Sequence, residues 1–100
     1  MDRLDAATLD DLALTLPGWQ LEREQGGRLR RTFEFPGFAQ AFAFMTEVAL
    51  AAERLNHHPD WSNSFNRVDI CLTTHDAGGL TRLDVELAQT VDRASARLLG

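Results

Sequence analysis

The chain has 100 residues, of which 44% are apolar and 25% charged, and its formal net charge is −5. This length suits one ordinary globular domain, so we expect a single domain over residues 1–100 with a core between two layers. The balance of 10 Arg against 15 Asp and Glu argues against a nucleic-acid partner, which needs a basic face. The lone Cys71 leaves no internal disulfide, and no apolar run reaches the ~20 residues of a membrane span. The N-terminus has no apolar signal core, so we expect a cytoplasmic protein without a membrane partner.

The first half of the chain predicts a helix, two strands and a second helix. Leucines at helical spacing follow Asp5, a candidate N-cap, and stop before Pro17. Residues 19–24 and 28–35 each alternate apolar and polar side chains around a Gln-Gly-Gly turn, which predicts a hairpin. Residues 38–55 predict a long amphipathic helix. Its apolar stripe is expected at Phe38, Phe42, Met45, Ala49 and Ala52.

The second half predicts two more strands and a last helix. Pro59 disfavours helical geometry at the residue before it, so a loop is expected to begin near His57. Residues 65–75 alternate with period 2, and residues 60–64 can form a short strand that pairs with them. A turn then leads into a helix over residues 80–98. The order α-β-β-α-β-β-α implies an α+β two-layer sandwich, with a four-stranded antiparallel sheet and helices on one face.

All three histidines, His57, His58 and His75, lie within 19 residues, close to ends of predicted elements. Glu53 lies one helical turn before His57, and Asp84 lies in the first turn of the last helix. Ends of elements can converge on one rim of a small sandwich, where loops commonly carry function. Three imidazoles and two carboxylates in one cleft are typical of a site for proton transfer near neutral pH.

Several of these residues also have a purely structural explanation. Asp84 stands three residues after Thr81, which is the spacing of a helix capping box. Glu53 could be a solvated helix residue, and His75 could be a surface imidazole. The pair His57-His58 is harder to explain in this way, because neither side chain suits a core.

A metal site is the rival use of these side chains, and the spacing disfavours it. Zinc sites commonly take a histidine pair four residues apart on a helix, or two ligands close together across a turn. His57 and His58 are adjacent, and in the extended geometry before Pro59 they point to opposite sides. We therefore predict no metal ligands. Cys71 has no partner at nucleophile spacing and is expected to pack.

The second half of the chain resembles the pterin-4a-carbinolamine dehydratases. The family pattern is an acidic residue, three positions, His-His-Pro, an aromatic residue six positions after the Pro, then a His and an Asp. The matching residues here are Glu53, His57-His58-Pro59, Phe65, His75 and Asp84. Further matches are Phe44-Met45-Thr46, Val48-Ala49-Leu50, Trp61, Asn63, Asn66, Val68, Leu72, Thr74 and Gly79-Leu80. The resemblance is specific over residues 38–84.

The resemblance implies a hydro-lyase that converts 4a-hydroxytetrahydropterin to quinonoid dihydropterin and so recycles the pterin of aromatic amino acid hydroxylases. It implies catalytic roles for His57 and His75 as acid and base, and for His58 in holding the substrate beside them. It also implies substrate-binding roles for Glu53, Trp61 and Asp84. Because loss of water is redox-neutral, no metal or organic cofactor is implied. A homodimer or a homotetramer is implied as well.

The chain departs from the family pattern at two positions, and two other functions remain open. Asn56 stands where members often carry an Asp, and Leu83 replaces an Arg that sometimes precedes the Asp. Neither change touches a histidine. The main alternative is a non-catalytic binding or assembly module of the same fold, and a small metal-binding domain is the third possibility.

Overall fold

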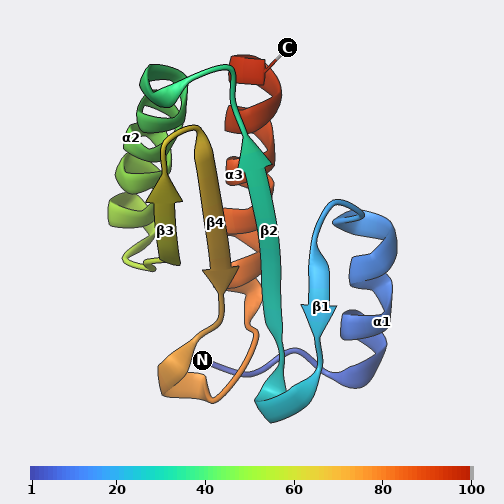
Figure 1. The fold of residues 1–100 in the computed structure, drawn as a ribbon. Coiled ribbons are helices and arrows are strands. Elements are labelled where there is room, and N and C mark those ends of the chain that lie inside the picture. The colour runs from blue at the N-terminus through green and yellow to red at the C-terminus, as the bar shows by residue number, and fades with distance from the viewer. Residues whose placement is uncertain (100) are drawn as a thin grey trace.

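The computed structural model describes residues 1–99, which form an α+β protein (Figure 1). Its helices are α1 Ala6–Thr15, α2 Phe38–Leu55 and α3 Arg82–Leu99. Its strands are β1 Gln20–Glu22, β2 Arg28–Glu34, β3 Asp60–Ser64 and β4 Arg67–Leu72. Two short 3-10 turns are η1 Glu24–Gly26 and η2 His75–Ala77. The predicted order of helices and strands is confirmed. No helix in residues 1–99 is both long and apolar enough to cross a membrane.

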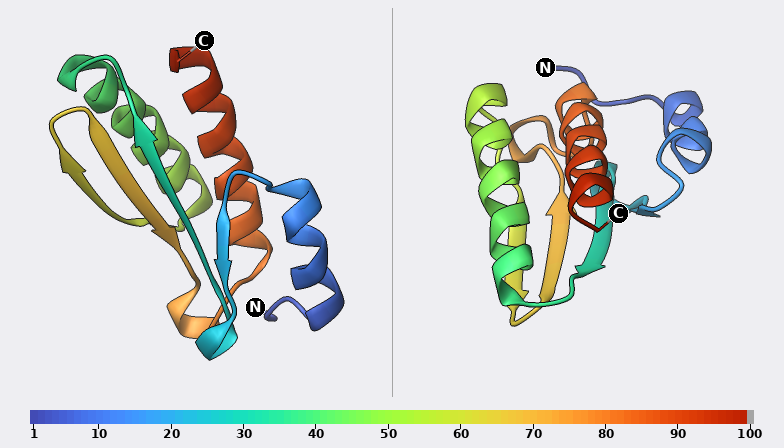
Figure 2. Two further views of the ribbon diagram at one scale, coloured as in Figure 1. Left: turned by 45° about the vertical axis from the view of Figure 1, so that its right-hand side comes forward. Right: turned by 90° about the horizontal axis from the view of Figure 1, so that it is seen from above.

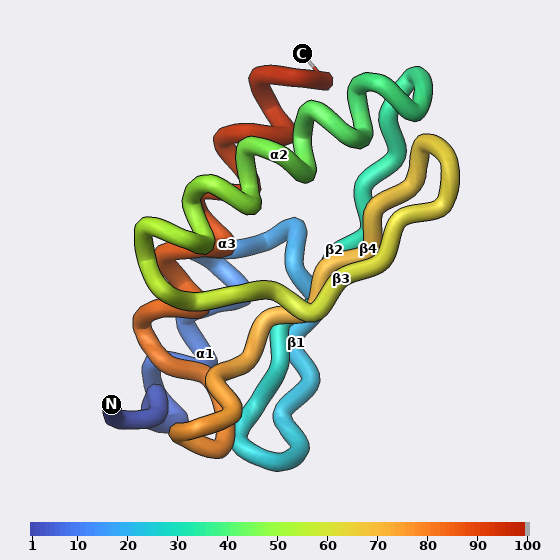
Figure 3. Tube along the Cα trace, turned by 90° about the vertical axis from the view of Figure 1, so that its left-hand side faces the viewer, coloured from blue at the N-terminus to red at the C-terminus, as the bar shows by residue number. Residues whose placement is uncertain are grey.

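The four strands form one antiparallel sheet in the order β1-β2-β4-β3. In the register, Leu29 of β2 lies opposite Leu72 of β4, and Ile70 of β4 lies opposite Trp61 of β3. The helices lie on one side of the sheet, which leaves its other face open (Figures 2 and 3). The predicted two-layer sandwich is confirmed.

The core lies between the sheet and the helices. Phe44 and Val48 of α2 and Leu87 of α3 are fully buried against the sheet. The Phe44 ring lies 4.9 Å from that of Phe33 on β2, measured between ring centroids. Burial of such side chains is the main favourable term in folding, at roughly 1.5–3 kcal/mol for each. The core therefore holds α2 and α3 in place on the sheet, and the candidate site lies at their ends.

The predicted apolar stripe of α2 is correct only in part: Ala52 is buried and Met45 packs against the core, but the other three residues lie outside it. Phe38 and Phe42 are 50% and 57% exposed. The face that packs on the core is made of Ala41, Phe44, Val48, Ala51 and Ala52. Helix α2 carries apolar residues on two sides, and helical periodicity does not say which side meets the sheet. The sheet meets the side that carries Phe44, whose ring packs against that of Phe33 on β2.

Two strands are shorter than their alternation predicts. Strand β1 has three residues, and Trp19 before it is buried in the core. Strand β4 begins only at Arg67, because Phe65 forms the hairpin turn with a φ of 51°. The pairing predicted for residues 60–64 requires a turn near this point, and Ser64 and Asn66 suit one. Positive φ is uncommon for an aromatic residue, so the alternation alone does not exclude Phe65 from the strand. Strand β4 also ends at Leu72, which places His75 in η2 and outside the strand.

Candidate active site

The candidate site lies at the end of the sheet where β3 begins and β4 ends (Figure 1). The chain enters it from the C-terminus of α2, where Asn56 takes a left-handed conformation with a φ of 51°. Asparagine tolerates this conformation better than most residues and often ends helices. The backbone N–H of His57 donates to the carbonyl of Ala52 at 3.0 Å. This helix end fixes the direction in which the His57-His58 segment leaves α2.

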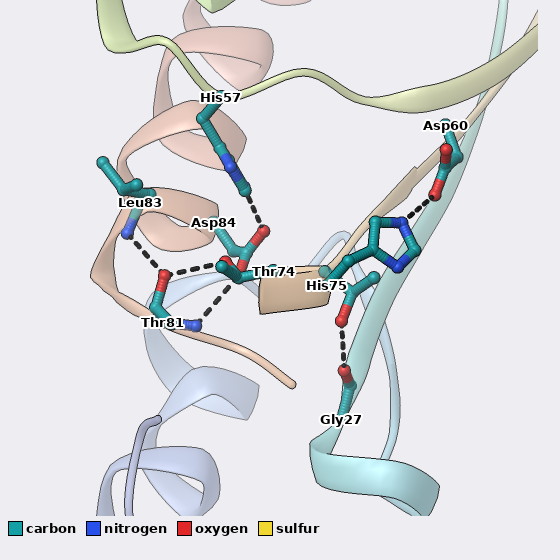
Figure 4. A network of polar contacts seen from close by, with 9 residues as sticks. Gly27, His57, Asp60, Thr74, His75, Thr81, Leu83 and Asp84 are labelled. Carbon is teal, nitrogen blue, oxygen red and sulfur yellow. Dashed lines mark hydrogen bonds and ion pairs between the residues drawn. The ribbon is translucent and has the colours of Figure 1, made fainter. Parts of the chain in front are cut away.

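His57 is buried against the first turn of α3. Its side chain points at Asp84, and the distance from Nε2 to Oδ1 is 2.6 Å (Figure 4). His57 is 8% exposed and Asp84 is fully buried. An ionised carboxylate only accepts hydrogen bonds, so Asp84 holds His57 with its Nε2 protonated. Within residues 1–99, Nδ1 of His57 has no hydrogen-bond partner. Every fully enclosed side-chain nitrogen or oxygen in these residues has a hydrogen-bond partner. Because Nδ1 of His57 has none, it is not fully enclosed and retains access to solvent.

Asp84 is held from its other oxygen by the N-terminus of α3. Its Oδ2 accepts the backbone N–H of Thr81 at 2.9 Å and the hydroxyl of Thr74 at 2.7 Å. The Thr81 hydroxyl accepts the backbone N–H of Leu83 at 3.3 Å. The predicted capping box is confirmed. The Asp84 carboxylate therefore both caps α3 and orients His57.

His58 points the other way and pairs with Glu53 of α2. The distance from Nε2 to Oε1 is 2.7 Å, and both side chains are more than half exposed. His58 and His57 thus lie on opposite sides of the loop, as expected for adjacent residues before Pro59. The Glu53 carboxylate orients the imidazole of His58. Because both side chains are exposed to solvent, the interaction between them contributes little to stability.

His75 lies in η2 and faces the first residue of β3. Its Nε2 is 3.3 Å from Oδ2 of Asp60, and both side chains are exposed (Figure 4). The sequence pattern did not indicate Asp60 as a partner of His75. Its position directly after His57-His58-Pro59 was the signal available, but only the pairing of β3 with β4 shows that it lies beside His75.

The loop that carries His75 is anchored on the turn between β1 and β2. The Thr73 hydroxyl donates to the carbonyl of Gly27 at 3.0 Å, and the backbone N–H of Leu80 donates to the carbonyl of Gly26 at 3.0 Å. A Cβ atom on Gly26 would lie 2.1 Å from the carbonyl oxygen of Gly78. The two turns approach so closely that only glycine fits there, and this contact limits the freedom of His75.

Trp61 is placed differently from the histidines. It is partly buried and packs against the core. Successive side chains along a strand point to opposite faces, so Trp61 and Asp60 lie on opposite sides of β3. Trp61 therefore faces the helix side, where His57 meets α3, and not the side on which Asp60 meets His75.

A hollow of about 820 Å³ lies over the face of the sheet that the helices leave open. Its lining includes Arg30, Asp60, Asp69 and Cys71, but none of the three histidines. The hydroxyl of Thr32 donates to Asp69 and holds the pKa of that carboxyl below its usual value. The hollow meets the candidate site at Asp60 and Trp61 and reaches no histidine, so we place the site at the histidines themselves.

The three imidazoles therefore share one arrangement: each is tied through Nε2 to a carboxylate on another element. These pairs lie at the same end of the sandwich, but they remain separate. In residues 1–99 no three His, Cys, Asp or Glu side chains gather in a geometry that could hold a metal ion. An imidazole tied at one nitrogen can exchange a proton at the other. The protein is thus a small α+β domain with three histidine–carboxylate pairs at one end of its sheet.

Comparison with known proteins identifies the family. The family model for pterin 4 alpha carbinolamine dehydratase matches residues 2–94. A relative from Rhizobium johnstonii is 50% identical over 97% of this chain and 95% of its own length. One from Synechococcus sp. is 58% identical over 83% of this chain and 86% of its own length. The names of both relatives give pterin-4-alpha-carbinolamine dehydratase as a proposed function. The chain belongs to the pterin 4 alpha carbinolamine dehydratase family.

Solved structures show the same fold. The crystal structure of a transcriptional coactivator/pterin dehydratase from Brucella melitensis has a TM-score of 0.88 and 38% identity, over 94% of this chain and 99% of that one. A pterin dehydratase-like protein, described as a RuBisCO assembly factor in the alpha-carboxysome, has a TM-score of 0.68 and 24% identity. It covers 78% of this chain and 89% of its own. The second likeness shows the fold alone.

Proposed function

We propose that the protein dehydrates 4a-hydroxytetrahydropterin to quinonoid dihydropterin and water. One observation carries the proposal: His57 is held through Nε2 by a buried carboxylate and keeps Nδ1 accessible, as a proton-transfer group requires. The family adds the substrate class. We further propose that the protein recycles the pterin of an aromatic amino acid hydroxylase in the cytoplasm. The lone Cys71 suits that reducing compartment.

The reaction needs two proton transfers. An acid protonates the 4a-hydroxyl, the lone pair of N5 forms a double bond to C4a, and the C4a–O bond breaks to release water. A base then removes the proton from N5. In our proposal His57 and His75 perform these two transfers at Nδ1, because the carboxylates of Asp84 and Asp60 occupy their Nε2 atoms. General acid–base groups each contribute about 10²–10⁴-fold.

The remaining predicted residues act around this pair. His58 is exposed and tied to Glu53, so it suits a contact that holds the substrate at the mouth of the site. Asp84 acts through His57, because it is fully buried and its oxygens already accept three hydrogen bonds. Trp61 would contact the pterin ring from the side of the sheet that the helices cover. The loss of water uses no redox step, so the proposal includes no metal or organic cofactor.

A stopped-flow assay tests this proposal. Chemically generated 4a-hydroxytetrahydropterin dehydrates slowly by itself, and we expect the protein to increase the rate in proportion to its concentration. The variant Glu86→Ala changes a partly exposed residue of α3 outside the site and should match wild type. A rate that stays at the uncatalysed value at every protein concentration would show that the protein is not this dehydratase.

A non-catalytic assembly module is the second candidate function. The fold also occurs in the protein described as a RuBisCO assembly factor, so the fold does not by itself require catalysis. The buried His57–Asp84 pair favours the enzyme, because a binding module has no need for an imidazole held by a buried carboxylate. The same stopped-flow assay separates the two candidates.

We also propose that the protein is a homodimer or a homotetramer. An exposed apolar face of α2 supports this proposal: Phe38, Phe42 and Leu50 are 50%, 57% and 58% exposed. The rings of Phe38 and Phe42 pack against each other, with centroids 5.9 Å apart. Large apolar side chains gathered on one helix face are typical of a protein interface.

The variant Phe42→Glu should convert the oligomer to smaller species, because a charge in an apolar interface is costly to bury. Light scattering after gel filtration measures the mass of the species. Leu14→Glu is the matched control, since Leu14 is 82% exposed on α1, away from α2. A monomeric wild-type protein, or an unchanged mass for Phe42→Glu, would contradict the proposed interface.

A further inference from the structure

Thr74 connects the two histidines that carry the proposed reaction. It directly precedes His75, and its backbone pairs with Gly79 through hydrogen bonds of 3.0 and 3.2 Å, which close the η2 turn. Its side chain points the other way, toward Asp84 and Thr81 (Figure 4). Thr74 thus lies between the turn of His75 and the carboxylate that holds His57.

The direction of each hydrogen bond around Thr74 follows from its chemistry. A threonine hydroxyl has one proton, and an ionised carboxylate only accepts, so Thr74 donates to Oδ2 of Asp84. The Thr74 oxygen must then accept the proton of the Thr81 hydroxyl, 2.8 Å away. The Thr81 oxygen is left to accept the backbone N–H of Leu83. The hydrogen bonds form one chain with a single direction, which ends on Oδ2 of the carboxylate whose Oδ1 accepts from His57.

We infer that Thr74 is a positioning residue, whose hydroxyl fixes the Asp84 carboxylate and through it the tautomer of His57. This inference rests on the proposed function only in the role that it gives His57. Oδ2 has two donors, Thr74 and the backbone N–H of Thr81. With the hydroxyl removed, one donor remains and the carboxylate can rotate about its last bond. Nε2 of His57 then loses a fixed acceptor, and Nδ1 is no longer held in its unprotonated form.

The variants Thr74→Val and Thr74→Ser test the inference in the full chain. Valine keeps the shape of threonine and removes the hydroxyl, whereas serine keeps the hydroxyl and removes the methyl group. Two-bond ¹H–¹⁵N correlation spectra of the imidazoles report which ring nitrogen carries the proton. In wild type and Thr74→Ser we expect His57 protonated at Nε2 alone when it is neutral. In Thr74→Val we expect both tautomers and faster exchange of the ring N–H with water.

Dehydration kinetics are the second measurement. We expect Thr74→Val to lower kcat by about 10- to 100-fold and to change KM far less. This is the usual effect of losing a hydrogen bond that orients a functional side chain. Thr74→Ser should stay within about threefold of wild type. If Thr74→Val does not fold, Thr74→Cys replaces it, because its thiol is a weak donor of similar size and should give an intermediate mixture of tautomers.

The inference is overturned if Thr74→Val keeps wild-type spectra of His57, or if Thr74→Ser changes as much as Thr74→Val, since the methyl group would then matter and not the hydroxyl. The tautomer is measured without substrate. A wild-type protein that fails to dehydrate the pterin would therefore refute the proposed function. The spectra of the Thr74 variants would still test the positioning role of Thr74.

Discussion

The variant His57→Gln is expected to lose about 10²–10⁴-fold in kcat/KM for dehydration, because it removes one of the two proton-transfer groups. Glutamine places its amide nitrogen close to the position of the histidine Nε2. It can therefore still donate to Oδ1 of the buried Asp84, but it has no nitrogen that titrates near neutral pH. Stopped-flow kinetics at pH 7 measure the loss.

The choice of glutamine separates chemistry from folding. His57→Ala would leave Oδ1 of Asp84 without its donor in a buried place, and the protein would lose stability as well as activity. For His57→Gln we expect a melting temperature close to that of wild type. Near wild-type turnover in the folded variant would remove His57 from the reaction and leave the buried pair as a structural feature only.

Asp84→Ala is expected to reduce stability more than any surface substitution in the chain. It removes the acceptor of three donors: the ring N–H of His57, the hydroxyl of Thr74 and the backbone N–H of Thr81. Leaving buried donors without partners costs about 1–3 kcal/mol each, so we expect a loss of about 3–5 kcal/mol in the free energy of unfolding. For a domain of this size the melting temperature should fall by about 12 °C or more.

Glu86→Ala is the matched control for Asp84→Ala. Both residues are acidic and lie on α3, but the Glu86 side chain is 45% exposed and pairs with Arg82 at 3.3 Å. An exposed pair of this kind contributes little, so we expect a change below about 0.5 kcal/mol. Urea unfolding followed by circular dichroism measures both variants. Equal stabilities of Asp84→Ala and Glu86→Ala would contradict the hydrogen-bond network described for Asp84.

Much of the candidate site could be predicted from local spacing. The capping box of Thr81 and Asp84 depends on residues three apart, and it is present as predicted. The opposite directions of His57 and His58 follow from Pro59, which imposes extended geometry on the residue before it. Contacts of this kind are made within one turn or one loop, so the sequence contains the information that they need.

The partners of the histidines could not be predicted with the same certainty. Asp60 meets His75 only because β3 pairs with β4, and Thr74 meets Asp84 only because the turn after β4 folds back on α3. Spacing along the chain does not contain these distances. The buried face of α2 is a similar case, because Phe44 and Phe42 are both large and apolar and only packing on the sheet decides between them.

The order of the elements, the antiparallel sheet with helices on one face, and the place of the histidines at ends of elements all follow from the amino-acid sequence. These features depend on periodicity, turn residues and local spacing, which act over a few residues. The burial of His57 against Asp84, with His58 and His75 exposed, is instead a result of packing between distant elements. The physical reason is that a carboxylate is stable in the core only where several donors from separate elements converge on it, and that convergence arises when the sheet and α3 pack together.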